Sequence, residues 1–243
     1  AFGKNSSFHE NAHNSFESAF EAYLVDLTTG ELSDLKTSGT ETINYSPSSA
    51  NVYNQNITLS SSGLNCDGIR FGQSQGTGTL ASGKTISIGA GFSAGELHLR
   101  NFNQIGATAQ NLTLTGSSLL NVLYSQWNGN VTFQSPRVLL ARTTYNGSSI
   151  IEKTGGTNDA CTGGNTFNGE TTLTNSGTAY FMTANGSAND FNGNVTYVKS
   201  STGLLYPSYN AKSTYAGNLT LHSNSTVRFA AAGNGKITMD GTG

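Results

Sequence analysis

Residues 167–173 read FNGETTL, and residues 191–197 read FNGNVTY, 24 positions further along the chain. Each segment has an aromatic residue, a small polar residue, a glycine and a short run that alternates polar and apolar side chains. The pattern recurs in three further segments: 127–133 (WNGNVTF), 145–151 (YNGSSII) and 215–221 (YAGNLTL). The five aromatic positions are 18, 22, 24 and 24 residues apart. A repeat of this length indicates a solenoid in which each repeat forms one coil.

The local pattern of one repeat predicts a short strand after a turn. Val131 and Phe133 are expected to face one side of the strand and Thr132 the other, because side chains alternate along a strand. We interpret the glycine as a turn residue with positive φ, beside an asparagine that tolerates the same region. A second apolar strand is expected in each coil, in segments 138–140, 179–181, 204–206 and 227–229.

The repeat predicts an all-β fold, a right-handed parallel β-helix (β-solenoid) of roughly ten coils over residues 51–243. Residues 1–50 match the repeat poorly and are expected to form an irregular N-terminal cap or an insertion. A β-sandwich array is the alternative, because short, evenly spaced strands are expected of both folds. The coil-sized repeat favours the solenoid. The chain stops within a repeat, which predicts a fragment of a larger protein.

Two sets of residues test the predicted stacking. The repeat aromatics are expected to be buried and stacked in successive coils: Trp127, Tyr145, Phe167, Phe191 and Tyr215. Cys66 and Cys161 lie 95 positions apart, which corresponds to about four coils or roughly 19 Å along the axis. A disulfide requires Cα atoms within about 7 Å of each other. Both cysteines are therefore expected to be free thiols.

The composition narrows the classes of partner. Only 11% of the residues are charged, compared with roughly 25% in an average soluble domain. The formal net charge is −2 and the 12 Lys and Arg residues are scattered. Nucleic-acid binding depends on clustered basic residues, so no nucleic-acid partner is expected. No apolar run reaches the 18 residues of a membrane-spanning helix, so the chain is not expected to span a membrane.

Three strings match catalytic motifs literally, and the repeat explains each of them better. His9 to His13 (HENAH) matches a zinc-protease motif with Glu10 as base, but only eight residues precede it. Residues 78–85 (GTLASGKT) match a phosphate-binding loop including Lys84, which requires a following helix, whereas ISI follows. Residues 72–76 (GQSQG) match a nucleophile elbow at Ser74, but GTGT at 76–79 breaks the helix that an elbow requires.

The sequence therefore predicts no catalytic, cofactor-binding or metal-binding residues and no enzymatic activity. His98 and His222 are present as potential partners for Ser74, without a pattern that joins them. Carbohydrate-active β-helices use paired carboxylates or a calcium-activated base. Outside the repeats there is one local cluster of acidic residues, Asp26, Glu31 and Asp34. Asp67, Asp159 and Asp190 each stand alone. A carbohydrate-binding or carbohydrate-active β-helix remains the alternative function.

Asn-x-Thr triplets recur at one position of the repeat: Asn56, Asn111, Asn130, Asn194 and Asn218. They match the N-glycosylation motif formally. Their recurrence in the coil is better explained by geometry. We expect these asparagines and threonines to hydrogen-bond from coil to coil along the rod.

Segments 165–181 (NTFNGETTLTNSGTAYF) and 191–196 (FNGNVT) resemble repeats in very large surface proteins of gliding and related Bacteroidota. Segments 83–89, 91–95 and 108–116 share the likeness, which covers residues 53 to 243. The resemblance implies export through the type IX secretion system, display on the outer cell surface, and a role as adhesin or structural stalk. It also implies surface polysaccharide or other cell-surface and secretion components as partners.

Overall fold

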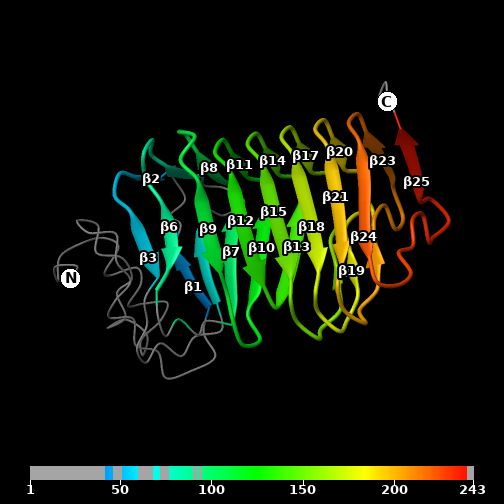
Figure 1. The fold of residues 1–243 in the computed structure, drawn as a ribbon. Coiled ribbons are helices and arrows are strands. Elements are labelled where there is room, and N and C mark those ends of the chain that lie inside the picture. The colour runs from blue at the N-terminus through cyan, green and yellow to red at the C-terminus, as the bar shows by residue number, and fades with distance from the viewer. Residues whose placement is uncertain are drawn as a thin grey trace, which may run out of the picture.

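The strands of this chain wind into coils that stack along one axis, so that the molecule is an elongated rod (Figure 1). The computed structural model describes residues 42–45, 51–59, 68–71, 77–89, 92 and 95–239. Within these ranges the chain forms strands and turns but no helix. The strands pair in parallel with their equivalents in neighbouring coils, as the pairs β12–β15 and β15–β18 illustrate. The predicted β-solenoid is confirmed.

Each coil contributes one strand to each of three faces. The first face begins with β1 (Thr42–Tyr45), β4 (Gly68–Phe71), β7 (Glu96–Arg100), β10 (Leu119–Leu123) and β13 (Arg137–Ala141). In later coils its place is taken by a separate sheet of β16 (Asp159–Ala160), β19 (Phe181–Met182) and β22 (Leu205–Tyr206).

The second face is one continuous sheet: β2 (Asn51–Tyr53), β5 (Gly78–Leu80), β8 (Phe102–Gln104), β11 (Gln126–Trp127), β14 (Thr144–Tyr145), β17 (Thr166–Phe167), β20 (Asp190–Phe191), β23 (Lys212–Tyr215) and β25 (Lys236–Met239). The third face contains a pair and then a six-stranded sheet: β3 (Ile57–Leu59) with β6 (Ile86–Ile88), then β9 (Gln110–Thr113), β12 (Val131–Ser135), β15 (Ser149–Lys153), β18 (Thr171–Asn175), β21 (Val195–Lys199) and β24 (Leu219–Ser223).

The described strands make up eight three-strand coils, and β25 begins another. This number is slightly smaller than the roughly ten coils expected from the repeat length. β1 lies within the stretch expected to be a cap or insertion, yet it pairs in parallel with β4. These four residues therefore belong to the coil stack. Residues 1–41 lie outside the described residues.

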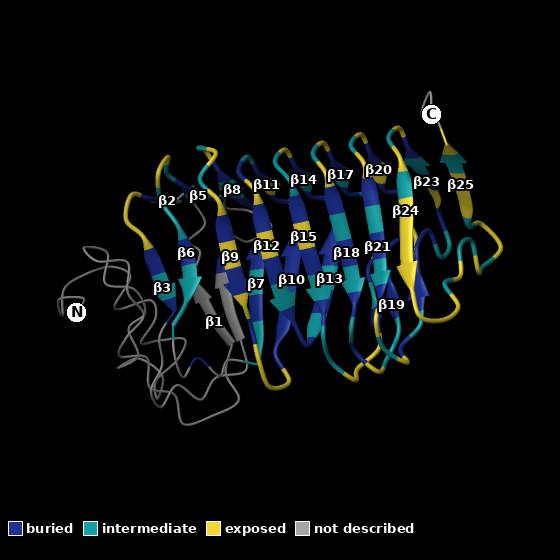
Figure 2. Ribbon diagram, in the orientation of Figure 1, coloured by how far each residue is buried: buried dark blue, intermediate teal, exposed yellow. Residues whose placement is uncertain are grey.

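The core is a continuous column of side chains from the inner faces of the strands (Figure 2). All five repeat aromatics are at most 1% exposed, which confirms the predicted burial. Four of their rings stack nearly parallel, with centroids 4.8 Å apart for Tyr145–Phe167, 4.9 Å for Phe167–Phe191 and 5.0 Å for Phe191–Tyr215. Trp127 instead packs at an angle against Phe102 and edge-on against Phe133.

The repeat glycines serve a different purpose from the one expected. None of Gly129, Gly147, Gly169, Gly193 and Gly217 has a positive φ. A Cβ atom at Gly169 would lie 2.5 Å from the carbonyl oxygen of Gly147 in the preceding coil. The same contact to the preceding coil, at 2.3–2.7 Å, recurs at the other four positions. The interpretation as positive-φ turns was wrong, because the glycine is required by close approach of successive backbones.

Asparagine side chains join the coils on the outside. The Nδ2 of Asn146 donates to Oδ1 of Asn128 at 2.6 Å, and Asn168 and Asn192 continue this series at 2.7 Å each. At the Asn-x-Thr position, the side-chain oxygens of Asn56, Asn130 and Asn194 accept hydrogen bonds from a backbone N–H of the next coil. The predicted coil-to-coil bonding is confirmed for these three asparagines.

A second series of polar side chains runs inside the rod, two residues before each repeat aromatic. The backbone N–H of Thr143 donates to Oδ1 of Asn165 at 3.1 Å, and that of Asn165 donates to Asn189 at 3.0 Å. Ser125 and Ser213 extend the series at its two ends. All five residues are buried. Each of these side chains accepts a backbone N–H of the preceding coil and so gives a buried donor at this corner a partner.

Candidate functional site

The motif strings do not form catalytic sites in the described part of the chain. In residues 78–85, Gly78–Leu80 is strand β5, a turn follows at 82–83, and the next element is strand β6 rather than a helix. The interpretation as a turn into a strand is confirmed. His9, Glu10 and His13, residues 72–76 with Ser74, and the acidic residues Asp26, Glu31, Asp34 and Asp67 lie outside the described residues.

The two histidines that could have completed a triad are far apart in the stack. His98 lies on β7, where its Nε2 is 2.5 Å from Oε2 of Glu96 and its Nδ1 is 3.3 Å from Nδ2 of Asn121. His222 lies on β24, in a coil near the other end, and is exposed. Among the described residues, no three His, Cys, Asp or Glu side chains are grouped to hold a metal ion.

Asp159 and Cys161 form a seam between β13 and the next coil, where the backbone ladder of the first face is interrupted. The N–H of Val138 donates to Oδ2 of Asp159 at 2.9 Å, and the N–H of Leu140 points to Sγ of Cys161 at 3.4 Å. The Nε of Arg137 donates to the other oxygen of Asp159 at 3.2 Å. These side chains thus replace strand–strand bonds, which indicates a structural role.

Burial governs the chemistry of this seam. Asp159 and Cys161 are fully buried, and desolvation raises the pKa of the Asp159 carboxyl and raises that of the Cys161 thiol to about 12. A thiol with such a pKa is a poor nucleophile. Cys161 is free and buried, as expected from the spacing. Cys66 lies outside the described residues.

Lys153, in the coil before the seam, is also fully buried. Its Nζ donates to the carbonyl oxygen of Gly155 at 2.5 Å. Desolvation lowers the pKa of this ammonium group, and the charge of Asp159 opposes that effect. Lys153 therefore fixes a turn of the chain rather than presenting a charge to solvent.

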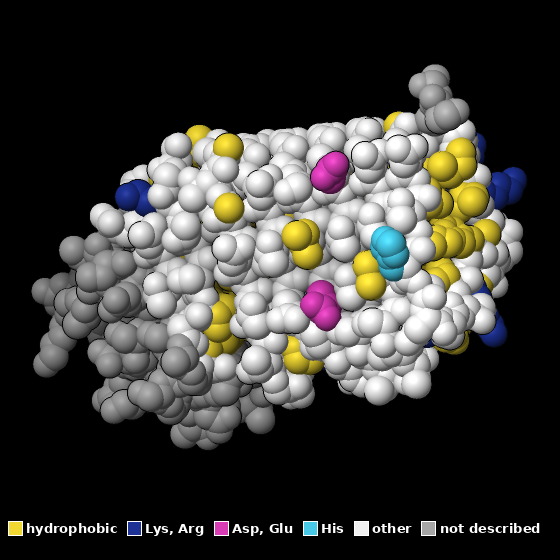
Figure 3. Space-filling view, viewed as in Figure 1, with side chains coloured by type: hydrophobic (Ala, Val, Ile, Leu, Met, Phe, Trp, Pro, Cys, Tyr) yellow, Lys and Arg dark blue, Asp and Glu magenta, His cyan; other side chains and the backbone are white. Residues whose placement is uncertain are grey.

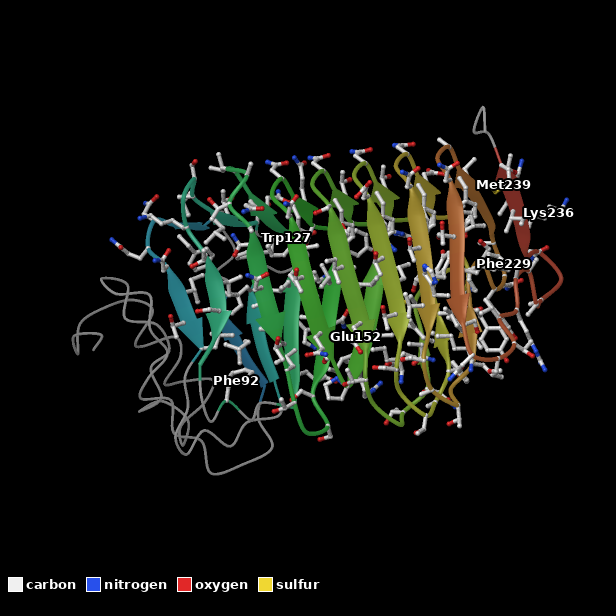
Figure 4. All side chains as sticks on the ribbon, viewed as in Figure 1. Phe92, Trp127, Glu152, Phe229, Lys236 and Met239 are labelled. Carbon is white, nitrogen blue, oxygen red and sulfur yellow. The ribbon has the colours of Figure 1, made fainter. Side chains whose placement is uncertain are left out.

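The outer surface of the third face is flat and nearly uncharged (Figure 3). One outward position of its strands carries Thr132, Ile150, Thr172, Thr196 and Thr220 in successive coils. Glu152 lies on the same face (Figure 4), where its carboxylate accepts hydrogen bonds from Gln134 at 2.9 Å and from Ser176. The carboxylate bridges three coils and thereby stabilises the face.

Two arginines and a tyrosine gather at the corner between the first and second faces. The guanidinium of Arg100 lies over the ring of Tyr124 at 5.4 Å from its centroid, and that of Arg142 lies at 5.3 Å. The Nη1 of Arg142 also donates to the Tyr124 hydroxyl at 2.9 Å. We call these three residues, from three successive coils, the arginine–tyrosine corner.

The backbone at this corner is strained. Tyr124 and Arg142 have φ values of 52° and 50°, in the left-handed region that bulky side chains avoid. This conformation costs about 1–2 kcal/mol per residue. In the next coil Gly164 occupies the corner with a φ of 77°, where glycine avoids this cost. Asn101 has the same conformation one coil earlier, with a φ of 49°, so the left-handed turn belongs to this corner of the coil, and two coils place a tyrosine and an arginine in it.

The sequence analysis missed the arginine–tyrosine corner. Its residues lie 24 and 18 positions apart, and none belongs to a known catalytic or binding motif. A signal was nevertheless present, because Tyr124 and Arg142 each lie three residues before a repeat aromatic. Aligning that position across the repeats would have placed the two side chains at the same corner of adjacent coils.

Comparisons with protein-family models, with curated protein sequences and with solved structures found no match to this chain. No helix that is long and apolar enough to cross a membrane occurs in the described ranges.

Proposed function

We propose that this chain is a structural and adhesive segment of a secreted bacterial cell-surface protein, in which the solenoid serves as a stalk. Each added coil extends such a rod by about 4.8 Å. The likeness of its repeats to those of Bacteroidota surface proteins supports export through the type IX system and display on the outer surface. The observation that carries the proposal is the continuity of the contacts between coils.

These contacts run side by side through the central coils. The strands pair in parallel on all three faces, the repeat aromatics stack inside, and asparagine amides join the coils outside. The buried series from Ser125 to Ser213 adds a fourth connection. A rod that is held at several points around its section resists bending, which is the property that a spacer between a cell and a surface requires.

The proposal assigns no catalytic step to the chain. Several described carboxylates are engaged by protein groups: Asp159 by β13, Glu152 by Gln134 and Ser176, Glu96 by His98, and Asp190 by Thr214. A glycoside hydrolase would instead direct two carboxylates at one bound sugar. These contacts favour a structural role over the carbohydrate-active alternative.

Labelling of intact cells tests the location. Antibodies raised against residues 95–239 should label the producing bacterium without permeabilisation, and protease added to intact cells should remove the signal. Cells that lack a functional type IX system should retain the antigen inside. Labelling that appears only after permeabilisation would overturn the proposal. Antibodies against a periplasmic protein serve as the control for cell integrity.

A further inference from the structure

We infer that the arginine–tyrosine corner binds an acidic polysaccharide, carboxylated or sulfated, that runs along the rod axis. This inference rests on the adhesive part of the proposed function and adds the chemical class of the surface that is bound. It is carried by the unpaired guanidinium groups, their fixed geometry and their spacing.

Both guanidinium groups are available to an anionic ligand. Within the described ranges the ion pairs are His98–Glu96 and Arg137–Asp159, so neither Arg100 nor Arg142 has a carboxylate partner there. Among the described residues the Nε of Arg100 has no hydrogen-bond partner, but it is buried, so a ligand would contact the terminal Nη groups of this guanidinium. A guanidinium presents five N–H donors in a planar fork that fits an oxyanion. An anion bound at this corner would pair with two positive charges that have no carboxylate partner among the described residues.

Backbone hydrogen bonds between coils hold the corner in place without a ligand. The N–H of Tyr124 donates to the carbonyl oxygen of Ala141 at 2.9 Å, and the N–H of Arg142 donates to that of Gly163 at 3.0 Å. A Cβ atom at residue 164 would lie 3.2 Å from Cγ of Arg142, so Gly164 leaves room for the arginine side chain. Side chains that are already ordered lose little entropy on binding.

The arrangement indicates a charged ligand rather than a neutral sugar. Tyr124 is 41% exposed, but its ring is in contact with two guanidinium groups, those of Arg100 and Arg142, which interact with its π-system. The ring therefore orients the two arginines, and the ligand meets their free N–H groups. Tyr124 is a positioning residue in this arrangement, and Arg100 and Arg142 are the contact residues.

The spacing of the charges favours a linear polymer. Arg100 and Arg142 are two coils apart, or about 10 Å along the axis. In a polymer with at least one charge per sugar, such as polygalacturonate or dextran sulfate, anionic groups two sugars apart are separated by a comparable interval. Duplex DNA carries one charge per roughly 1.7 Å and needs a broad basic surface. The residues at the same corner in the adjoining coils, Asn101 and Gly164, are uncharged, so the corner does not extend into the broad basic surface that DNA requires.

Binding of the purified full chain to immobilised polymers tests the inference. The probes are polygalacturonate, dextran sulfate, neutral dextran and duplex DNA, measured by biolayer interferometry at low and at physiological ionic strength. We expect both acidic polysaccharides to bind and neutral dextran not to bind. Arg142→Asn should raise Kd about tenfold, because one charge-assisted contact is lost. Asparagine tolerates the left-handed backbone of this position, as Asn101 shows in the same stack.

Matched variants separate the corner from general charge. Lys84→Asn removes one positive charge from the turn between β5 and β6, away from this corner, and it should change Kd less than twofold. Tyr124→Asn should weaken binding although no charge is lost, because both arginines lose their support. Unchanged melting temperatures of the variants would exclude unfolding as the cause.

Three results would overturn the inference: equal weakening by Arg142→Asn and Lys84→Asn, binding of neutral dextran as tight as that of the acidic polymers, or no binding at low ionic strength. Tighter binding of DNA than of the polysaccharides would assign the corner to nucleic acid instead. All these measurements use purified protein, so their failure is distinct from a failure of surface labelling.

Discussion

Strands β21 and β24 are neighbours with the same register, yet their side chains have opposite environments. Tyr197 of β21 pairs with Leu221 of β24. Tyr197 is fully buried, whereas Leu221 is 46% exposed. In Figure 2 the strands of the central coils are largely buried, while β24 is exposed along most of its length. Identical alternation therefore gives burial in one coil and exposure in the next.

The difference shows that burial in this rod depends on having a coil on both sides. Leu221 occupies the inward position of its strand, but in the described structure coils cover β24 on one side only. Phe229 and Met239, labelled at the same end in Figure 4, are likewise only partly covered or exposed. In repeat proteins stability is a sum of contacts between neighbouring repeats, so equal substitutions should have unequal effects in the two regions.

The largest difference is expected for the stacked rings. Phe167→Ala removes a ring between Tyr145 and Phe191 and should lower the free energy of unfolding by about 3–5 kcal/mol. Phe229→Ala removes a partly buried ring that touches Tyr197 edge-on, and it should cost about 1 kcal/mol. Urea unfolding followed by the fluorescence of Trp127 measures both. Similar losses in the two variants would contradict the dependence on neighbouring coils.

A closer match is available at one register position. Leu173 of β18, Tyr197 and Leu221 are aligned in successive coils. Leu173 is fully buried, so Leu173→Ala should cost about 2–5 kcal/mol. Leu221→Ala, the same substitution at the exposed end, should cost less than about 1 kcal/mol. Amide hydrogen exchange adds spatial detail, since Leu173→Ala should increase exchange in β15 and β21 but Leu221→Ala should not.

The repeat glycines give a third pair. At Gly169 a methyl group would meet backbone atoms of Gly147 and Ser148, which have no rotamer to move away. Gly169→Ala should therefore cost about 1–3 kcal/mol or more. Nothing lies within 4 Å of a Cβ atom at Gly233, so Gly233→Ala should be close to neutral. Thermal melting of the two variants measures these effects. An unchanged melting temperature for Gly169→Ala would mean that neighbouring coils can move apart without a loss of stability.

The sequence predicted the fold because the relevant signals are local and repeated. The alternation of Val131, Thr132 and Phe133 defines a strand face, and the recurring aromatics define which strands stack. The ordinary rule that glycine marks a positive-φ turn failed at Gly129 and its equivalents, since the contact that selects glycine comes from another coil. A contact between residues about 20 positions apart leaves no mark in the local pattern.

The candidate site was hidden for the same reason. Arg100, Tyr124 and Arg142 become neighbours only when coils of 24 and 18 residues are stacked in register, and the unequal coil lengths obscure that register. The seam at Asp159 was hidden too, because the sequence does not show where the first face breaks into two sheets. The exposure of Leu221 depends on what adjoins its coil, which its own strand cannot reveal.

Tyr145→Phe is expected to change the free energy of unfolding least at neutral pH, but to change its dependence on pH above 10. The hydroxyl of Tyr145 is buried and has no hydrogen-bond partner among the described residues, so its removal should be neutral or slightly stabilising at pH 8. Burial raises the pKa of Tyr145 well above its ordinary value, and it also raises those of Tyr197 and Tyr215. Above pH 10 the unfolded chain loses these protons while the folded chain retains them.

Because the folded state then binds more protons, its stability falls as the pH rises above 10. Each such tyrosine contributes a slope of up to about 1.4 kcal/mol per pH unit. Tyr145→Phe removes one of these contributions, so its unfolding free energy should decline less steeply than that of the wild type between pH 10 and 11. Urea midpoints at pH 8, 10 and 11 measure the slopes. Parallel slopes for the two proteins would show that the Tyr145 hydroxyl ionises in the folded rod, and that the central coils admit water.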